Sequence, residues 1–219
     1  MTDWVGWHGD YDDPSTGLAQ RLRAVQGQVA DALEDAGPGP LRVVSMCAGQ
    51  GRDLLGVLAG HPRRGDVRAR LVELDARNAA TASAAAEAAG LDGVEVVIGD
   101  ASETTAYDDA VPADLVLVCG VFGHASDDDI RRIVFHLPML CASGATVIWT
   151  RGGFQSDLRP VIRGWFTEAG FEEIAFLTGD SGSWGVGANR LVAPPSPYQP
   201  GIRLFTFLDV LPASGRTPS

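Results

Sequence analysis

The stretch VVSMCAGQGRD, residues 43–53, decides how the rest of the chain is interpreted. Its apolar run, Val43–Met46, predicts a buried strand. A small, glycine-containing turn follows and leads into Asp53, Leu54 and Leu55, which predict the start of a helix. A strand, a tight turn and a helix N-terminus together form a frequent site for part of a nucleotide, because backbone N–H groups approach the ligand closely there.

The composition excludes several classes of function. The 219 residues carry a net charge of −11 and include no lysine. This absence excludes a phosphate loop that ends in Gly-Lys-Ser/Thr, a Schiff-base enzyme, a pyridoxal phosphate enzyme with its own lysine, and a dehydrogenase with a catalytic lysine. The arginines are scattered rather than gathered, so nucleic acid is not an expected partner.

The sequence also lacks the features of a membrane or secreted protein. No run reaches the roughly 18 apolar residues of a membrane span. The acidic N-terminus has neither the basic start nor the apolar core of a signal peptide. Cys47, Cys119 and Cys141 do not have the spacing of metal ligands. We therefore expect reduced thiols in a cytoplasmic protein that binds no metal through them.

From residue 41 onward, strand patterns alternate with helix patterns. The expected strands are 41–46, 67–73, 94–98, 113–119, 144–150, 171–177 and 202–208, and the expected helices are 52–59, 77–89, 126–140 and 158–169. Several strands are continuous apolar runs, which predicts an α/β fold with a doubly wound, mostly parallel seven-stranded sheet and helices on both faces. Residues 178–201 look like a loop, so the last strand is expected to be antiparallel.

Residues 1–40 are expected to form a lid and a helix ahead of the α/β domain, which spans 41–211; residues 212–219 are expected to be a disordered tail. Apolar residues recur at helical spacing within 15–36 and predict an amphipathic helix: Leu18, Leu22, Val25, Val29 and Leu33. Before this helix lies an aromatic cluster that either anchors it or closes over a ligand: Trp4, Trp7, His8 and Tyr11.

The glycine spacing in the turn indicates which kind of nucleotide it binds. A dinucleotide turn needs glycine at positions 47, 49 and 52, and Cys47 and Arg52 break that pattern. A spacing of 47, 49 and 51 is matched by Gly49 and Gly51. With this second spacing, the turn resembles motif I of the class I S-adenosylmethionine-dependent methyltransferases.

Three more strand ends carry the same resemblance: LVELD after the second strand, VIGDA after the third and LVLVCGVFGH after the fourth. The resemblance covers about residues 41–210. It implies S-adenosylmethionine as cofactor and a sheet with an antiparallel last strand. It also implies a donor-binding role for Cys47, Ala48, Gly49, Gly51, Asp53, Glu73, Leu74, Asp100, Ala101, Cys119 and Gly120.

The resemblance implies that each acid binds a different part of the donor. Glu73 accepts hydrogen bonds from the ribose hydroxyls. Asp100 faces the adenine amine, and Ala101 offers its backbone N–H to the ring. Asp53 either contacts the methionine amine or interacts with the helix dipole.

Two positions depart from the family pattern. The acid near the end of the first strand is replaced by Ser45, and the first glycine is replaced by Cys47. A cysteine fits such a turn if its φ stays negative and its side chain points away from the donor. We therefore expect Cys47 to be a packing residue and not a nucleophile.

His124 follows the fourth strand, at the edge where ligands lie in such sheets, and is the candidate general base. His8 and Tyr11 on the expected lid are the other candidates for the chemistry. The candidate substrate contacts are Trp7, Arg151 and Trp184, with Arg151 suited to an acidic group.

The expected activity is methyl transfer to an oxygen or nitrogen of a small-molecule acceptor. This reaction is an in-line displacement, to which positioning contributes roughly 7–11 kcal/mol. The alternatives are a non-catalytic or regulatory S-adenosylmethionine binder, an NAD-dependent oxidoreductase and an aminopropyltransferase. Neither the acceptor nor the oligomeric state follows from the sequence.

Overall fold

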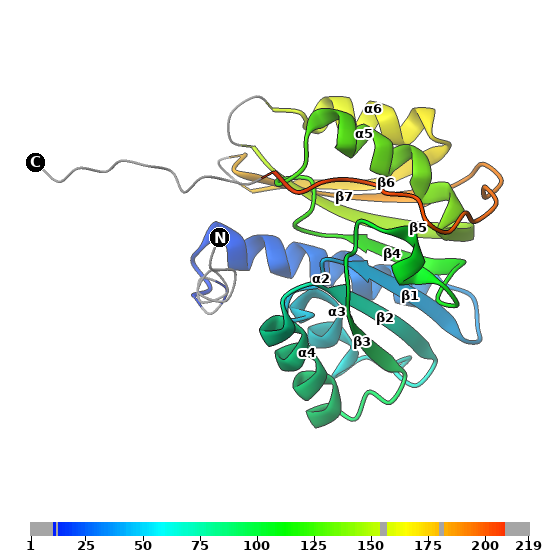
Figure 1. The fold of residues 1–219 in the computed structure, drawn as a ribbon. Helices are drawn as coiled ribbons and strands as arrows, with labels where there is room; N and C mark the ends of the chain where they lie inside the picture. The colour runs from blue at the N-terminus through cyan, green and yellow to red at the C-terminus, as the bar shows by residue number, and fades with distance from the viewer. Residues whose placement is uncertain (1–10, 12, 154–156, 180–181, 209–219) are drawn as a thin grey trace, which may run out of the picture.

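The computed structural model describes residue 11 and residues 13–153, 157–179 and 182–208. Its centre is one seven-stranded sheet with the order β3-β2-β1-β4-β5-β7-β6 (Figure 1). The strands β1 to β5 run parallel, and β7 is antiparallel to both of its neighbours. Their bounds are β1 Leu41–Met46, β2 Val67–Glu73, β3 Val94–Ile98, β4 Ala113–Val118, β5 Cys141–Gly152, β6 Phe171–Thr178 and β7 Trp184–Leu191.

Helices cover both faces of this sheet, as expected (Figure 1). One face carries α2 (Gly17–Asp35), α3 (Arg52–Leu58) and α4 (Ala76–Ala88), and the other carries α5 (Asp127–His136) and α6 (Arg159–Glu168). Side chains of a strand alternate between these two cores: Leu115 and Leu117 join the first, and Val116 and Val118 the second. The doubly wound prediction is therefore confirmed.

The predicted helix starts depend on local capping. The carboxylate of Asp75 accepts the N–H of Arg77 at 2.8 Å and begins α4. The hydroxyl of Ser126 accepts the N–H of Asp129 at 3.1 Å and begins α5. This helix ends at His136, and Pro138 follows within a short 3₁₀ turn.

The antiparallel strand lies where a loop was expected. β7 is formed by Trp184–Leu191, whereas residues 202–208 make only an isolated bridge, between Glu103 and Arg203. The prediction of a strand at 202–208 is therefore wrong. The sequence WGVGANRL resembled a loop because its glycines are typical of turns.

Within β7 the glycines serve packing. A Cβ on Gly187 would lie 2.3 Å from the indole of Trp149, whose Nε1 donates to the Oδ1 of Asn189 at 2.8 Å. A Cβ on Gly185 would lie 2.8 Å from the side chain of Arg159. Large side chains of neighbouring elements therefore occupy the space that a side chain on β7 would need.

The helix before the sheet packs directly onto it. The hydroxyl of Thr16 accepts the N–H of Ala19 at 3.1 Å and caps α2. The helix then buries Val25, Val29 and Leu33 in the core that it shares with α3 and β7. The expected lid residues Trp4, Trp7 and His8, and the tail 212–219, lie outside the described residues.

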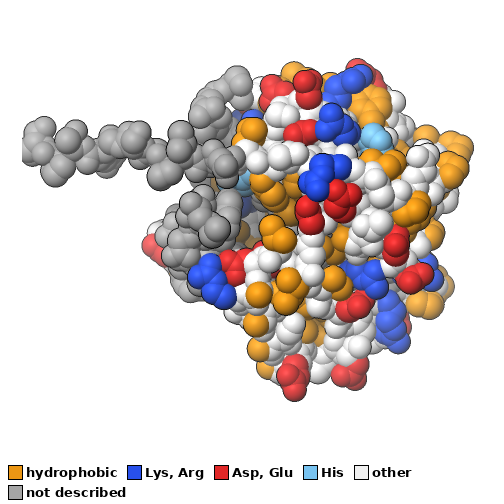
Figure 2. Space-filling view, viewed as in Figure 1, with side chains coloured by type: hydrophobic (Ala, Val, Ile, Leu, Met, Phe, Trp, Pro, Cys, Tyr) orange, Lys and Arg blue, Asp and Glu red, His pale blue; other side chains and the backbone are white. Residues whose placement is uncertain are grey.

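Two surface properties bear on partners. No helix within the described ranges has the length and apolar character needed to cross a membrane. On the face seen in Figure 2, arginine and acidic side chains are intermixed rather than separated by sign.

Substitution of Gly187 by alanine tests the packing of β7. We expect Gly187→Ala to lower the free energy of unfolding by about 1–3 kcal/mol, because the new methyl group overpacks the core against Trp149. Urea titration measures this change. Gly164→Ala is the matched control: Gly164 lies within α6, a Cβ there meets nothing within 4 Å, and the change should be neutral or stabilising. Equal stability of Gly187→Ala and the native protein would contradict the packing argument.

Candidate functional site

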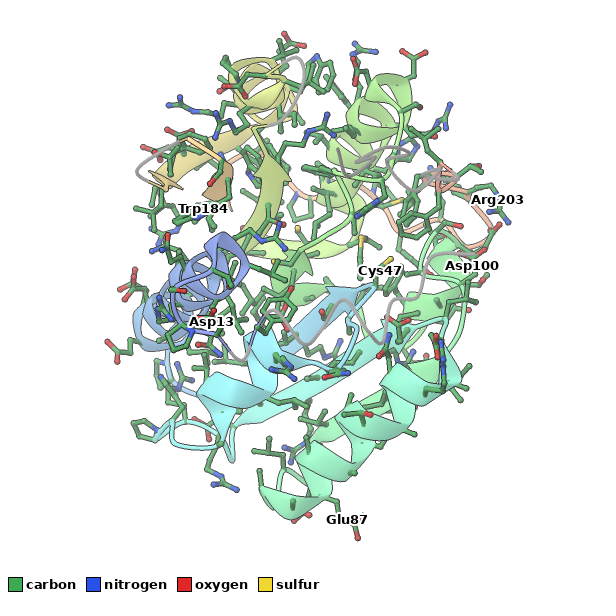
Figure 3. The ribbon with its side chains drawn as sticks, turned by 90° about the vertical axis from the view of Figure 1, so that its left-hand side faces the viewer. Asp13, Cys47, Glu87, Asp100, Trp184 and Arg203 are labelled. Carbon is green, nitrogen blue, oxygen red and sulfur yellow. The ribbon has the colours of Figure 1, made fainter. Side chains whose placement is uncertain are left out.

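The site lies where the sheet order reverses. β1 is followed by α3 on one face, and its neighbour β4 is followed by α5 on the other. The connections that leave the carboxyl ends of these two strands therefore diverge, which is where doubly wound sheets bind ligands. Figure 3 shows Cys47, Asp100 and Arg203 at this edge of the molecule.

Glu73 joins the glycine turn to the connection after β2. Its Oε2 accepts the N–H of Gly49 at 2.7 Å, and its Oε1 accepts the N–H of Asp75 at 2.8 Å. The residue is only 9% exposed, so a buried charge is compensated by two backbone donors. Each carboxylate oxygen can still accept a second hydrogen bond from a ligand hydroxyl.

The turn itself is a tight backbone loop. Gly51 has a φ of 68°, and a Cβ there would lie 2.8 Å from the side chains of both Leu55 and Leu71. Gly49 has a φ of 57°, and the carbonyl of Ala48 accepts the N–H of Gly51 at 2.8 Å. Both glycines are therefore needed for the backbone path, and Gly51 also for close packing of α3.

Cys47 adopts a conformation opposite to the one expected. Its φ is 51°, so the condition of a negative φ is not met, and this left-handed conformation costs a non-glycine residue about 1–2 kcal/mol. The side chain packs against the core beneath α5. Burial, with the carboxylates of Glu73 and Asp100 nearby, raises the pKa of the thiol far above its ordinary value. A protonated thiol is a poor nucleophile, which supports a packing role.

Ser45 occupies the other departure from the family pattern. It is 1% exposed within β1, and its hydroxyl has no hydrogen-bond partner among the described residues. It offers no charge to a ligand. The nearest acid along the chain that can do so is Asp53.

Asp53 lies half-buried in the first turn of α3. Its Oδ1 accepts the N–H of Leu54 at 2.9 Å, and it makes no ion pair with any described residue. Burial raises its pKa to about 6. Ionisation of this buried carboxyl group is costly, and a cationic group beside it would make the ionisation favourable.

Asp100 and Ala101 follow β3. The Oδ1 of Asp100 accepts the N–H of Ser102 at 2.9 Å and its hydroxyl at 2.7 Å. Partial burial raises the pKa of Asp100, but these bonds and Arg203 outweigh it and hold the pKa below its ordinary value. The carbonyl of Ala101 accepts the hydroxyl of Tyr107 at 2.6 Å, which fixes the loop.

Exposed apolar side chains accompany these acids. Leu74, directly after Glu73, is 67% exposed, and Ile98, beside Glu73 in the β2–β3 register, is 62% exposed. Large apolar residues at the edge of the site suit the face of a planar base.

The end of β4 is held by its neighbour β5. The N–H of Gly120 donates to the hydroxyl of Thr150 at 2.8 Å, and Gly120 has a φ of 78°. Cys119 is half-buried, and burial raises the pKa of its thiol well above the ordinary value. Both residues therefore shape the edge without adding a reactive group.

His124 lies in the connection from β4 to α5 and is half-buried. Burial lowers its pKa, and the charges of Arg21 and Arg151 lower it further. The guanidinium of Arg151 donates to the carbonyl of Phe122, so it also holds the loop that carries His124. The lowered pKa favours the neutral imidazole, which is the form that a general base needs.

Tyr11 is the part of the expected lid that the structure describes. Burial raises the pKa of its phenol, although the charge of Arg21 and a hydrogen bond from it act in the opposite direction. The guanidinium of Arg52 lies 5.5 Å from the centre of its ring. Tyr11 thus lies near the first turn of α3. His8 and Trp7 lie outside the described residues.

Trp184 is a strand residue rather than a loop residue. It pairs with Gly152 at the carboxyl end of β5, so it does lie at the expected edge. It is 9% exposed, and its indole packs near Gly17 and Gly179. A substrate contact by Trp184 stays a prediction.

Arg21 was missed by the sequence reasoning. The helical pattern of α2 marks only its apolar stripe, and nothing local to Arg21 indicates that the first turns of this helix cross the sheet edge. Arg203 was missed as well, because its contacts with Ser102 and Glu103 join residues far apart in the chain.

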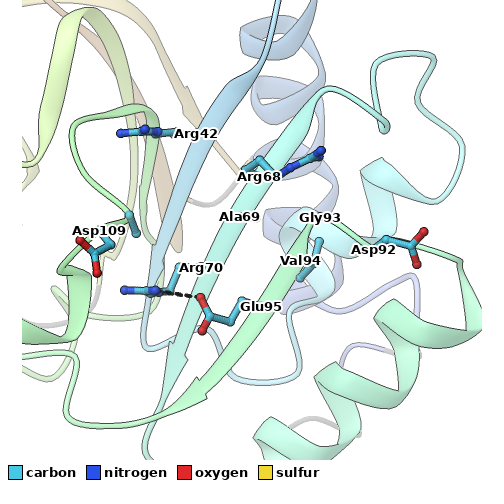
Figure 4. A pocket seen from close by; sticks show the side chains of 10 residues that line it. Arg42, Arg68, Ala69, Arg70, Asp92, Gly93, Val94, Glu95 and Asp109 are labelled. Atoms are coloured by element: carbon cyan, nitrogen blue, oxygen red, sulfur yellow. Dashed lines mark hydrogen bonds and ion pairs between the residues drawn. The ribbon is translucent and has the colours of Figure 1, made fainter.

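A hollow of about 280 Å³ lies at the opposite edge of the sheet (Figure 4). It is lined by Arg42, Arg68 and Arg70 and by Asp92, Glu95 and Asp109, and Arg70 is bound to Glu95 at 2.9 Å. None of the predicted site residues lines it. Because parallel sheets bind ligands at their carboxyl ends, we assign the site to the other edge. Within the described residues, no group of three or more His, Cys, Asp or Glu side chains is placed to hold a metal ion.

Comparison with known proteins identifies the fold of this chain but no protein related to it in sequence. The chain matches no family model, and no curated protein matches it in sequence. Solved structures do match. The magnesium protoporphyrin IX methyltransferase of Synechocystis PCC 6803, solved with bound S-adenosylmethionine, has 14% identity and a TM-score of 0.65, over 87% of this chain and 91% of that one.

Two further structures have the same architecture. The 1,6-didemethyltoxoflavin-N1-methyltransferase of Burkholderia thailandensis, solved with its acceptor and S-adenosylhomocysteine, has 18% identity and a TM-score of 0.62, over 87% of this chain and 86% of that one. An O-methyltransferase family protein from the same organism has 17% identity and a TM-score of 0.59, over 77% of this chain. The match covers 56% of that protein's length. The chain therefore has the methyltransferase fold that these proteins share.

The pKa of Asp53 generates a prediction about stability. Because the pKa of Asp53 is raised to about 6, its ionisation lowers the stability of the folded state little below about pH 4. The loss of stability grows between pH 4 and pH 6 and reaches its full size above pH 6. We expect Asp53→Asn to raise the free energy of unfolding by about 1–2 kcal/mol at pH 7 and not at all at pH 4. Denaturant titrations at both pH values measure this. Asp92→Asn, at an exposed position, is the control and should show no such dependence. A destabilised Asp53→Asn at pH 7 would contradict this assignment.

Proposed function

We propose that this protein is an S-adenosylmethionine-dependent methyltransferase that acts on an oxygen or nitrogen of a small-molecule acceptor. The observation that carries the proposal is the position of Asp53, Glu73 and Asp100. Asp53 follows β1, Glu73 ends β2 and Asp100 follows β3, and these three strands are neighbours in the sheet. Their order along the edge matches the order of the amine, the ribose and the base in one adenosyl amino acid.

The donor supplies a methyl group on a positively charged sulfur, so the protein mainly has to bind and orient it. Glu73 accepts from the ribose hydroxyls while it holds the turn. Asp53 pairs with the methionine amine, and its ionisation becomes favourable with that cation beside it. Asp100 and the N–H of Ala101 receive the adenine edge, and Leu74 lies against the ring.

The acceptor lies beside His124, at the end of β4. A neutral imidazole there would take the proton from the acceptor hydroxyl or amine. The acceptor oxygen or nitrogen would bond to the methyl carbon as the bond from that carbon to the donor sulfur breaks, so that S-adenosylhomocysteine leaves as the neutral thioether. Tyr11 covers the site beside α3 and helps to exclude water. His8 and Trp7, the other lid residues expected from the sequence, lie outside the described residues. Arg151 attracts an acidic substituent on the acceptor. The fold neighbours support the reaction class, and the acceptor stays open.

A non-catalytic or regulatory S-adenosylmethionine binder is the second candidate. Ser45 and the strained Cys47 favour it, because both depart from the family pattern at the turn. An NAD-dependent oxidoreductase and an aminopropyltransferase are weaker candidates, and ligand binding separates all of them from a methyltransferase.

Binding of S-adenosylhomocysteine tests the donor assignment. A ligand that binds only the native state adds about 2.7 kcal/mol to its stability at 100 times its Kd. We expect a clear rise in Tm with S-adenosylhomocysteine, a smaller rise with decarboxylated S-adenosylmethionine, which lacks the carboxylate, and none with NAD. A rise with NAD and none with S-adenosylhomocysteine would refute the proposal.

Variants of His124 test the base. We expect His124→Gln to lower kcat by about 10²–10⁴-fold with unchanged affinity for S-adenosylhomocysteine, because glutamine keeps a hydrogen bond but accepts no proton at neutral pH. In the native enzyme, kcat should fall as the pH drops through the lowered pKa of His124, and this limb should be lost in the variant. His136→Gln, on the exposed end of α5, is the control. If kcat of His124→Gln equals that of the native enzyme, His124 is not a general base, and positioning of the two reactants alone accounts for the rate.

A further inference from the structure

Residues 198–208, called the C-terminal strap below, pack against the connection after β3 and end beside the connection after β4. The hydroxyl of Tyr198 donates to the carbonyl of Thr104 at 2.6 Å, and the N–H of Ile202 donates to the hydroxyl of Thr104 at 2.9 Å. Leu204 is 1% exposed and Phe205 is fully buried. The strap is therefore an ordered part of the fold, held by its own backbone and apolar contacts.

The strap joins the connection after β3 to the connection after β4. The N–H of Leu204 donates to the carbonyl of Ser102 at 2.7 Å. Further along, the N–H of Leu208 donates to the carbonyl of His124 at 2.8 Å. The ring of Phe207 lies 6.2 Å from that of His124. The strap thus contacts both the loop of Asp100, the acid expected to bind adenine, and the loop of His124, the expected general base.

Arg203 is the charged residue that the strap brings to Asp100 (Figure 3). Its Nη1 lies 2.9 Å from the hydroxyl of Ser102 and 3.4 Å from the Oδ2 of Asp100. Its Nη2 pairs with the Oε1 of Glu103 at 2.6 Å. The same Ser102 hydroxyl donates to the Oδ1 of Asp100 at 2.7 Å. Arg203, Ser102 and Asp100 thus form a closed triangle of polar contacts.

This triangle leaves one oxygen of Asp100 available. Oδ1 accepts two hydrogen bonds from Ser102, whereas among the described residues Oδ2 has only the long contact with Arg203. The side chain of Asp100 is 44% exposed, so an N–H donor of a ligand can reach it. A nearby cation keeps this carboxylate ionised and hence an acceptor only.

We propose that Arg203 is a positioning residue that makes the donor site selective for an amino-substituted purine, by holding Asp100 with Oδ2 turned toward the 6-amino group. An ionised Oδ2 accepts from this amine and repels the 6-oxo group of hypoxanthine. The inference rests on the proposed function, because it takes the adenosyl donor as the ligand.

A comparison of two ligands tests this role. Calorimetry would measure the Kd of S-adenosylhomocysteine and of S-inosylhomocysteine, which carries a 6-oxo group, for the native protein, Arg203→Gln and Asp100→Asn. We expect Arg203→Gln to weaken binding of S-adenosylhomocysteine by about 3–10-fold and to leave S-inosylhomocysteine within about 2-fold, since exposed charge pairs have modest energies. On an Asp100→Asn background, Arg203→Gln should have no further effect.

Arg190→Gln is the matched control. Arg190 is also an exposed arginine near an aspartate, Asp35 at 3.5 Å, but lies in β7 on the side of α2. It should change neither affinity. Equal loss of both ligands in Arg203→Gln, or no loss of either, would overturn the positioning role while leaving the proposed function standing. Failure of the native protein to bind S-adenosylhomocysteine would remove both.

Discussion

The carboxylate of Glu73 holds together the two connections on which the rest of the site depends. One oxygen binds the N–H of Gly49 in the turn after β1, and the other binds the N–H of Asp75 at the start of α4. Without this carboxylate, two buried backbone donors would lose their partner, at about 1–3 kcal/mol each. The same group lies at the edge where the ribose is expected, so in the proposed function one acid would both build the turn and bind the ribose.

Around this bond the site contains several costly arrangements. Cys47 is held in a left-handed conformation, and Asp53 is half-buried without a cation. Both lower the stability of the folded protein. Such costs concentrate at functional sites. The proposed donor carries a cationic amine, which would offset the cost of ionising Asp53.

Local physics made much of this fold predictable. Continuous apolar runs placed β1 to β5, and the caps at Asp75 and Ser126 placed two helix starts. β7 was missed because its glycines looked like turn residues. Gly185 and Gly187 instead leave room for the bulky side chains of Arg159 and Trp149, which no local pattern reveals. The positive φ of Cys47 does not follow from its residue type, because the turn determines it. Arg21 and Arg203 act across long sequence separations, so only the folded chain shows their place.

A crystal structure of the protein with S-adenosylhomocysteine would show whether Glu73 binds the ribose while it holds the turn. We expect both ribose hydroxyls within hydrogen-bonding distance of the Glu73 carboxylate, with its bonds to Gly49 and Asp75 intact and the homocysteine amine beside Asp53. A ligand bound with its ribose away from Glu73, or in the arginine-lined hollow at the opposite edge of the sheet, would contradict it.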